Sequence, residues 1–243
     1  PAGQPGGFWT VEYYAQYFNV DTNDVLQRML GTLLPNISFT DLIGTNPDLY
    51  GPFWIATTVI FSIFIASSVA GSLNALLRNG TYTPDMTILS VAVTTVYVFV
   101  TALPLAVWGV LRYYKGPASL LQMIDAWGYA LTVWIPVSLL CIIPFDIVRW
   151  VLVVLAFASS FFFKIRTLRP LVSQTSNASV AQTTILGILL VTDLGLALLF
   201  KFYFYTFDVT SPGSGAGAGK GTTNATSFEV GVRGLSVGLG GSE

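Results

Sequence analysis

The chain has 243 residues, of which 53% are hydrophobic and only 9% are charged, and its net charge is −1. About 25% of the residues of a soluble globular protein are charged, so this composition excludes that class and predicts a membrane protein. Eleven basic residues balanced by twelve acidic ones leave no cationic surface for nucleic acid.

The composition also limits the chemistry that the chain can perform. It contains no histidine and a single cysteine, Cys141, which excludes the usual general base, an internal disulfide and a cysteine-rich metal site. A metal site built from carboxylates alone stays open, but the acids form no cluster that supports one. We therefore expect no catalytic residue, no cofactor site and no metal site, and no enzyme.

Residues 1–52 are predicted to form a polar N-terminal segment that carries one short amphipathic helix. Asp21 or Thr22 can cap the start of this helix, and Pro35 follows its end. We expect the helix to lie on the membrane surface or against the membrane helices, with docking of a cytosolic partner as the alternative. The helical period gives an apolar face of Val25, Leu26, Met29, Leu30 and Leu33 and a polar face of Asn23, Asp24, Gln27 and Arg28.

The stretch NPDLYGPFWI follows, from Asn46 to Ile55. Pro52 suits the first turn of a helix because the N–H that it lacks would have no partner there. Gly51 permits a sharp entry, and Asp48 can accept hydrogen bonds from the free N–H groups of that first turn. The aromatic rings of the stretch suit the level of the lipid headgroups. We predict a rigid joint between the N-terminal segment and the first membrane helix.

Five apolar runs then form a membrane domain over residues 53–206. A helix needs roughly 20 residues to cross the hydrocarbon core, and the first, second and fifth runs reach that length. The third and fourth are shorter and closely spaced, which favours two crossings over a re-entrant pair. The prediction is an all-α integral membrane protein with five transmembrane helices, at about 53–77, 87–111, 126–143, 148–163 and 182–206.

Charged residues within these runs need an explanation, because an acid at the membrane centre costs about 2.5–3.5 kcal/mol. Asp193 lies in the fifth run, and we expect either a hydrogen bond that fixes helix packing or, alternatively, an ion or proton pathway. Asp125 is expected near water at a helix N-terminus, and Lys201 is expected to reach the luminal interface. The candidate hydrogen-bond partners of Asp193 are Ser62, Thr94, Thr132 and Ser138.

Basic residues in the short loops predict the orientation. The five on one side are Arg112, Lys115, Lys164, Arg166 and Arg169, against Arg78 and Arg149 on the other. This asymmetry predicts a cytosolic N-terminus and a luminal C-terminus. Residues 207–243 are predicted to be a flexible, Gly/Ser/Thr-rich luminal tail, in which Asn224 is the candidate glycosylation site.

Several motifs in this order resemble the Yip domain family of Ypt/Rab-interacting membrane proteins, in the branch that carries DLYGPFWI. They are the aromatic N-terminal segment beginning FWTVEYYAQYF, NPDLYGPFWI, PLAVWG, GYALTVWIP and VRWVLVVLA. The resemblance covers roughly residues 8 to 205 and implies five spans with a cytosolic N-terminal region. It implies the Golgi membrane, or the ER and ER–Golgi vesicles, as the location.

The resemblance also implies a function in vesicle-mediated transport, as an adaptor for Rab-type small GTPases and other Yip-family membrane proteins in the lipid bilayer. The alternative hypothesis is a small channel or transporter that uses Asp193. The family motif is also the candidate for partner contact, and its residues are Asp48, Leu49, Tyr50, Gly51 and Pro52.

Overall fold

The computed structural model describes residues 18, 20–33, 47–77, 79, 81–143 and 145–205, all of which belong to one compact unit. Five helices in this part of the chain are long and apolar enough to cross a membrane, which confirms the predicted all-α membrane fold. The elements are α2 (Thr22–Leu33), α4 (Tyr50–Leu77), α5 (Met86–Tyr113), α6 (Leu120–Ala130), η1 (Leu131–Val133), α7 (Trp134–Leu140), α8 (Asp146–Val172), α9 (Ala178–Leu199) and η2 (Phe200–Phe204).

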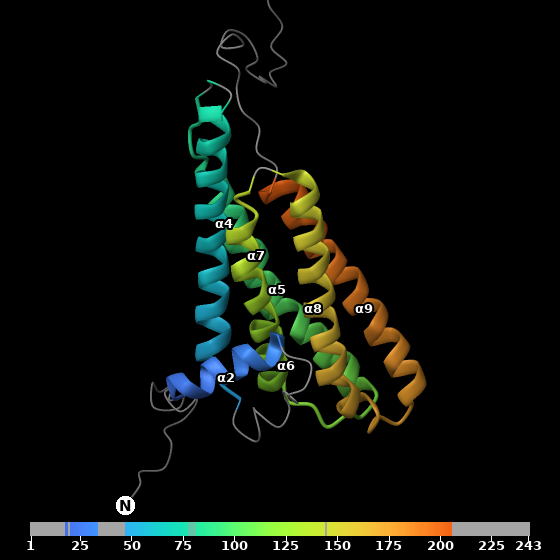
Figure 1. Ribbon diagram of the computed structural model, residues 1–243. Coiled ribbons are helices and arrows are strands. Elements are labelled where there is room, and N and C mark those ends of the chain that lie inside the picture. The colour runs from blue at the N-terminus through green and yellow to red at the C-terminus, as the bar shows by residue number, and fades with distance from the viewer. Residues whose placement is uncertain are drawn as a thin grey trace, which may run out of the picture. The chain divides into compact units, whose positions relative to one another are not determined.

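The spanning helices form a bundle in which successive helices run in opposite directions (Figure 1). Helix α4 packs against α5, α6 and α7, and α8 packs against α9. The short helix α2 lies across the end of the bundle at which α4 begins, where it contacts α6 and α8. This end, with α2 on it, is called the α2 end below.

The third crossing begins earlier than predicted, at Leu120, and is interrupted in the middle. Its start is a capping box: the Gln122 N–H donates to Ser119 Oγ at 3.2 Å, and the Ser119 N–H donates to Gln122 Oε1 at 3.3 Å. Pro136 lacks the N–H that would bond to the carbonyl of Thr132, and the 3₁₀ turn η1 lies there. Helices α6 and α7 with η1 therefore make one crossing of 21 residues.

Helix α8 is longer than the predicted fourth span and continues to Val172. Lys164, Arg166 and Arg169, which we expected in a cytosolic loop, lie within this helix, so that part of the prediction is wrong. The reason is that each of these charges is stabilised in a way that counting apolar residues does not detect. The Lys164 ammonium pairs with an acid inside the bundle, and long arginine stems can lie along apolar surface while the guanidinium reaches the interface.

Small residues on one side of α4 allow close packing. Ala66, Ala70, Ser67 and Gly71 are all buried. The ring of Tyr82 folds over Gly71, where an added Cβ would come within 2.3 Å of it. Helix α4 is thus held closely along its length as well as at its start.

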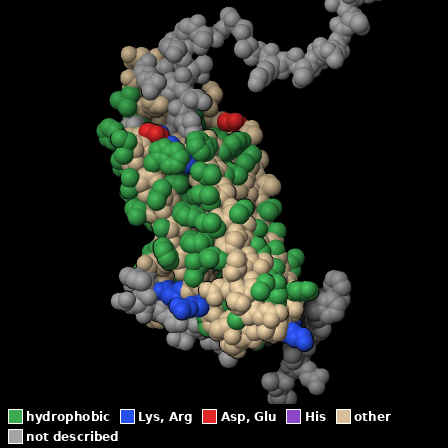
Figure 2. Space-filling model, turned by 90° about the vertical axis from the view of Figure 1, so that its right-hand side faces the viewer, with side chains coloured by type: hydrophobic (Ala, Val, Ile, Leu, Met, Phe, Trp, Pro, Cys, Tyr) green, Lys and Arg blue, Asp and Glu red, His purple; other side chains and the backbone are tan. Residues whose placement is uncertain are grey.

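On the face shown in Figure 2, a hydrophobic band lies between two ends that carry charged side chains. On the face shown, basic side chains gather at the lower end and acidic side chains at the upper end, with hydrophobic side chains between them. Arg112, Lys115 and Arg169 are exposed. At the opposite end the basic groups are used internally: Lys201, expected to reach the interface, is 5% exposed and donates to Asp146 at 2.5 Å. Arg149 there donates to the carbonyl of Cys141 at 3.1 Å.

Candidate functional site: the Asp48 joint

The carboxylate of Asp48 connects three helices. Its Oδ1 accepts a hydrogen bond from the Gly51 N–H of α4 at 2.6 Å, and its Oδ2 accepts one from the Tyr129 hydroxyl of α6 at 3.0 Å. Arg28 of α2 forms an ion pair with the same Oδ2. Asp48 is only 2% exposed, and Arg28 only 6%. The predicted role of Asp48 at the start of the first membrane helix is confirmed by its bond to Gly51.

Two glycines allow α4 and α6 to meet at this carboxylate. A Cβ added at Gly51 would lie within 2.3 Å of the Tyr129 ring, and one at Gly128 would lie 2.4 Å from the Cα of Pro52. Each glycine therefore makes room for a bulky group of the other helix. The motifs NPDLYGPFWI and GYALTVWIP, far apart in the sequence, form one contact. We call Arg28, Asp48, Gly51, Gly128 and Tyr129 the Asp48 joint.

A second carboxylate lies beside the joint. We expected Asp125 near water, and this is wrong: α6 begins at Leu120, which places Asp125 within the helix, where it is fully buried. Within the described part of the chain its two oxygens have no hydrogen-bond partner. Burial by itself lowers the pKa of Arg28, but the facing charges of Asp48 and Asp125 outweigh burial, and the net effect raises this pKa. Arg28 therefore stays a guanidinium cation at physiological pH.

The joint sets the rotation of α2 about its own axis. Arg28, expected on the polar face, is buried together with Val25, Gly31 and Thr32. Part of the expected apolar face points outward instead. The exposed fractions are 51% for Leu26, 54% for Leu30 and 41% for Leu33. The prediction is therefore wrong for Arg28, which turns inward because it pairs with a buried carboxylate. The exposed leucines agree with an apolar face that lies on the membrane surface.

A further contact holds the C-terminal end of α2. Nη2 of Arg166 in α8 donates to the carbonyl oxygen of Gly31 at 3.1 Å. The last carbonyls of a helix have no partner within that helix, so this bond satisfies one of them. Helix α2 is thus attached to α4 and α6 at Arg28 and to α8 near its end.

The motif residues divide between a buried and a more exposed part. Asp48, Gly51 and Pro52 are buried, Leu49 is half-buried, and Tyr50 is 39% exposed. A contact between this motif and a partner stays a prediction, and the exposed rings are the part that a partner can reach. Asn224, Arg78 and the tail 207–243 lie outside the described residues.

Asp193 of α9 has a partner that the sequence analysis missed. It forms an ion pair with Lys164 of α8, and both residues are almost completely buried. The Lys164 ammonium also lies 4.5 Å from the ring centre of Phe99 and 5.5 Å from that of Trp127. The expected hydroxyl partners are thus wrong. An isolated acid inside a span needs a cation from another span as its partner. Lys164 could have been recognised as that cation, because it directly follows three phenylalanines and so continues an apolar run.

The charged residues described here do not gather into a metal site. In the described ranges, no group of three or more His, Cys, Asp and Glu residues is placed to hold a metal ion. The Asp48 joint is an internal network in which one carboxylate bonds to a guanidinium, a phenol and a backbone N–H. Such a network can fix the position of a helix.

Comparisons with known proteins show which family the chain resembles. The Yip1 domain family matches residues 30–200. Protein YIPF1 homolog of Dictyostelium discoideum is 33% identical over 199 residues, which cover 80% of this chain and 55% of that protein. Protein YIP5 of Schizosaccharomyces pombe is 34% identical over 188 residues, which cover 74% of each.

The chain thus spans little more than half the length of the first of these relatives. No solved structure matches it. The family match covers part of α2, the DLYGPFWI motif, the GYALTVWIP motif and all five spanning helices up to the beginning of η2. The chain belongs to the Yip family of membrane proteins.

Proposed function

We propose that this protein acts in vesicle-mediated transport as a membrane adaptor for Rab-type small GTPases and for other Yip-family membrane proteins. We place it in the Golgi membrane, or in the ER and the vesicles between them. The observation that carries the proposal is the Asp48 joint, because it builds a fixed, non-spanning helix onto one end of a membrane bundle. An adaptor needs such a presented surface and no catalytic group.

In this proposal the α2 end faces the cytosol and the C-terminus faces the lumen. Arg112, Lys115 and Arg169 are exposed at the α2 end, whereas Lys201 and Arg149 at the other end bond within the protein. Exposed basic residues favour the cytosolic side of a membrane. Glycosylation of Asn224 provides a direct test, because the enzyme that attaches glycans to asparagine acts in the lumen. An unmodified Asn224 with a protease-sensitive tail on the cytosolic side would contradict this orientation.

Helix α2 offers two exposed faces with different roles. Its leucine face, formed by Leu26, Leu30 and Leu33, suits the lipid headgroup region, where an amphipathic helix buries apolar side chains. The polar face carries Asp24 and Gln27, both exposed. With the leucines toward the lipid, the polar face points to the cytosol. We assign partner contact to this polar face and to the exposed rings next to Asp48.

The test is association with prenylated and unprenylated Rab proteins, measured by pull-down with the full chain in lipid nanodiscs. Asp48→Ala should weaken binding about tenfold, because α2 is no longer held in place, and should leave membrane insertion intact. The matched control is Asp85→Asn, which removes an exposed negative charge at the other end of the bundle while its side-chain oxygen can still accept from the Thr87 N–H and cap α5. Absence of association with every Rab tested, or equal binding by both variants, would sink the proposal.

A second candidate function is a small channel or transporter that uses Asp193. The observation in its favour is the Lys164–Asp193 pair, since charged residues inside spans often mark transport pathways. Its test is ion or proton flux into liposomes that contain the wild type or Asp193→Asn. Absent flux, or flux that the substitution does not change, would remove this candidate.

A further inference from the structure

We propose that the cleft between α2 and α8 binds one anionic phospholipid from the leaflet on the α2 side, with its phosphate at Arg169 and an acyl chain along Phe162. The cleft holds a cavity of ≈ 440 Å³. The lining residues that matter here are Leu33 of α2 and Ser159, Phe162, Phe163, Arg166 and Arg169 of α8.

The lining changes character along α8 in the order that a phospholipid requires. Ser159, Phe162 and Phe163 lie closer to the middle of the spanning helix, and Arg166 and Arg169 lie closer to its end at Val172. The two arginines are three residues apart and so share one side of the helix. Among the residues that the structure describes, none of those lining the cleft is acidic. A cleft with an apolar inner part and a cationic outer part matches a hydrocarbon chain joined to an anionic headgroup.

The two arginines have different roles in this cleft. Arg166 donates to the Gly31 carbonyl and thereby fixes the wall that α2 forms. Arg169 is exposed, and within the described ranges its guanidinium has no ion-pair partner. A guanidinium can bind two oxygens of a phosphate at once. Arg169 is therefore the group that binds the headgroup, and Arg166 maintains the shape of the cleft.

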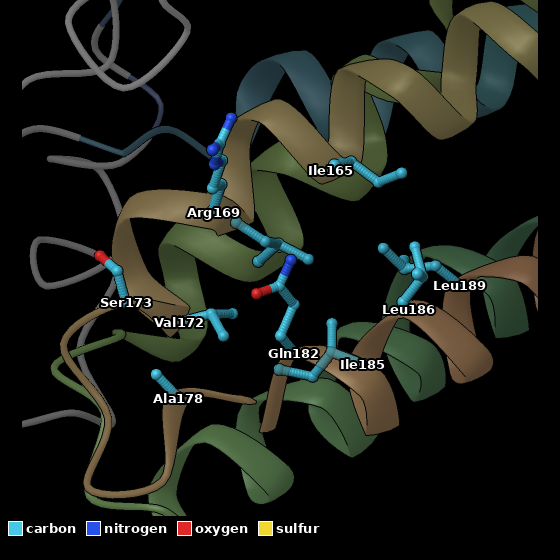
Figure 3. Close-up of a pocket in the computed structure, with 10 residues that line it drawn as sticks. Ile165, Arg169, Val172, Ser173, Ala178, Gln182, Ile185, Leu186 and Leu189 are labelled. Carbon is cyan, nitrogen blue, oxygen red and sulfur yellow. The ribbon is translucent and has the colours of Figure 1, made fainter. Parts of the chain in front are cut away.

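A neighbouring cavity helps to decide which of the two cavities the positive charge of Arg169 faces. A cavity of ≈ 400 Å³ lies between α8 and α9 and shares Ile165 and Arg169 with the first. Figure 3 shows that Gln182 points into this second cavity, whereas the Arg169 side chain turns away from it. Arg169 lines both cavities, and because its guanidinium turns away from Gln182 in Figure 3, we assign its charge to the cleft on the α2 side.

The leucine face of α2 continues the same lipid surface. Leu33 both belongs to this face and lines the cleft, and Leu26 and Leu30 follow it along the exposed side of α2. A lipid in the cleft would therefore contact α2 and α8 together. Its headgroup would lie at the level where α2 rests on the bilayer.

Native mass spectrometry of the purified full chain, delipidated and then given defined lipids, tests the proposal. We expect one tightly held phosphatidylserine, phosphatidylinositol or phosphatidic acid per chain and weaker binding of phosphatidylcholine. Arg169→Gln should lower anionic lipid binding about fivefold, the effect of one basic side chain at a lipid surface. Its matched control, Arg112→Gln, removes an exposed arginine of the α2 end that does not line the cleft and should change nothing.

A second variant tests the acyl-chain part of the site. Ser159→Phe should fill the inner part of the cleft and also lower binding, whereas Val154→Phe, on the exposed side of the same helix, should not. Inorganic phosphate at millimolar concentration should fail to displace the lipid. Equal binding of phosphatidylcholine and anionic lipids, equal effects of Arg169→Gln and Arg112→Gln, or displacement by phosphate would each overturn the proposal.

Discussion

The Arg28–Asp48 pair and the Lys164–Asp193 pair are both buried, yet they join different kinds of helix. Arg28–Asp48 attaches the non-spanning helix α2 to the start of α4, and Asp48 has further bonds to Gly51 and Tyr129. Lys164–Asp193 joins two spanning helices between aromatic rings. Loss of the first pair should release one peripheral helix, whereas loss of the second should destabilise the whole bundle.

The largest effect is therefore expected from Lys164→Met. It leaves the Asp193 carboxylate buried without its cation, which should lower the free energy of unfolding by about 3–5 kcal/mol. Steric trapping in bicelles measures this free energy. The matched control is Lys164→Leu with Asp193→Leu, which removes both charges and should recover most of the loss. A double variant as unstable as the single one would show that the pair contributes more than charge compensation.

Close packing at the Asp48 joint should give the next largest effect. Gly128→Ala places a Cβ against the backbone of Pro52, which cannot move without shifting α4. We expect a loss of about 1–3 kcal/mol in the free energy of unfolding. Gly109→Ala is the control, because a Cβ there meets no atom within 4 Å. Equal stability of the two variants would contradict the close contact between α4 and α6.

A smaller effect is expected from Tyr129→Phe, which removes one hydrogen bond to Asp48 and keeps the ring. Because Arg28 and the Gly51 N–H still bind the carboxylate, the loss should be about 0.5–1.5 kcal/mol. Steric trapping in bicelles measures this loss in the free energy of unfolding. The control Tyr113→Phe changes an 81% exposed tyrosine and should be neutral. A neutral Tyr129→Phe would mean that this hydroxyl does not support the joint.

The smallest effect is expected at the end opposite α2. The Asp146 side chain is 68% exposed and pairs there with Lys201. Lys201 is buried, but the exposed Asp146 carboxylate is screened by water, and Asp146→Asn keeps an oxygen that can accept from Lys201. Asp146→Asn should therefore change the midpoint of thermal unfolding very little. A loss of stability as large as that of Lys164→Met would show that the partly exposed pair contributes as much as the fully buried one, and would contradict the comparison.

The sequence predicts the spanning helices well because long apolar runs are a strong signal. It also predicts the position of Asp48 at the start of α4, since Gly51 and Pro52 mark a helix start directly after it. These features are local in the chain, and a helix start depends on the residues that immediately surround it.

The residues that complete the joint could not be predicted in the same way. The hydrophobic pattern places Arg28 on a polar face. Tyr129 lies 81 residues from Asp48, so no local signal connects the two. Lys164 reads as a loop residue until the buried acid Asp193 provides its partner. A hydrophobic pattern places Asp193 inside the membrane but assigns Arg28 and Lys164 to polar surroundings, so it gives no local sign of contacts between charges that are distant in the chain.

Hydrogen exchange of α2 in nanodiscs tests the central claim, that the Asp48 joint holds the peripheral helix α2 in place far more than it stabilises the spanning helices. In Asp48→Ala the amides of Thr22–Leu33 should exchange at least about tenfold faster, while those of the spanning helices keep most of their protection. Asp193→Asn should loosen α8 and α9 and leave α2 less affected. Unchanged protection of α2 in Asp48→Ala, or loss of protection throughout the bundle, would contradict the account.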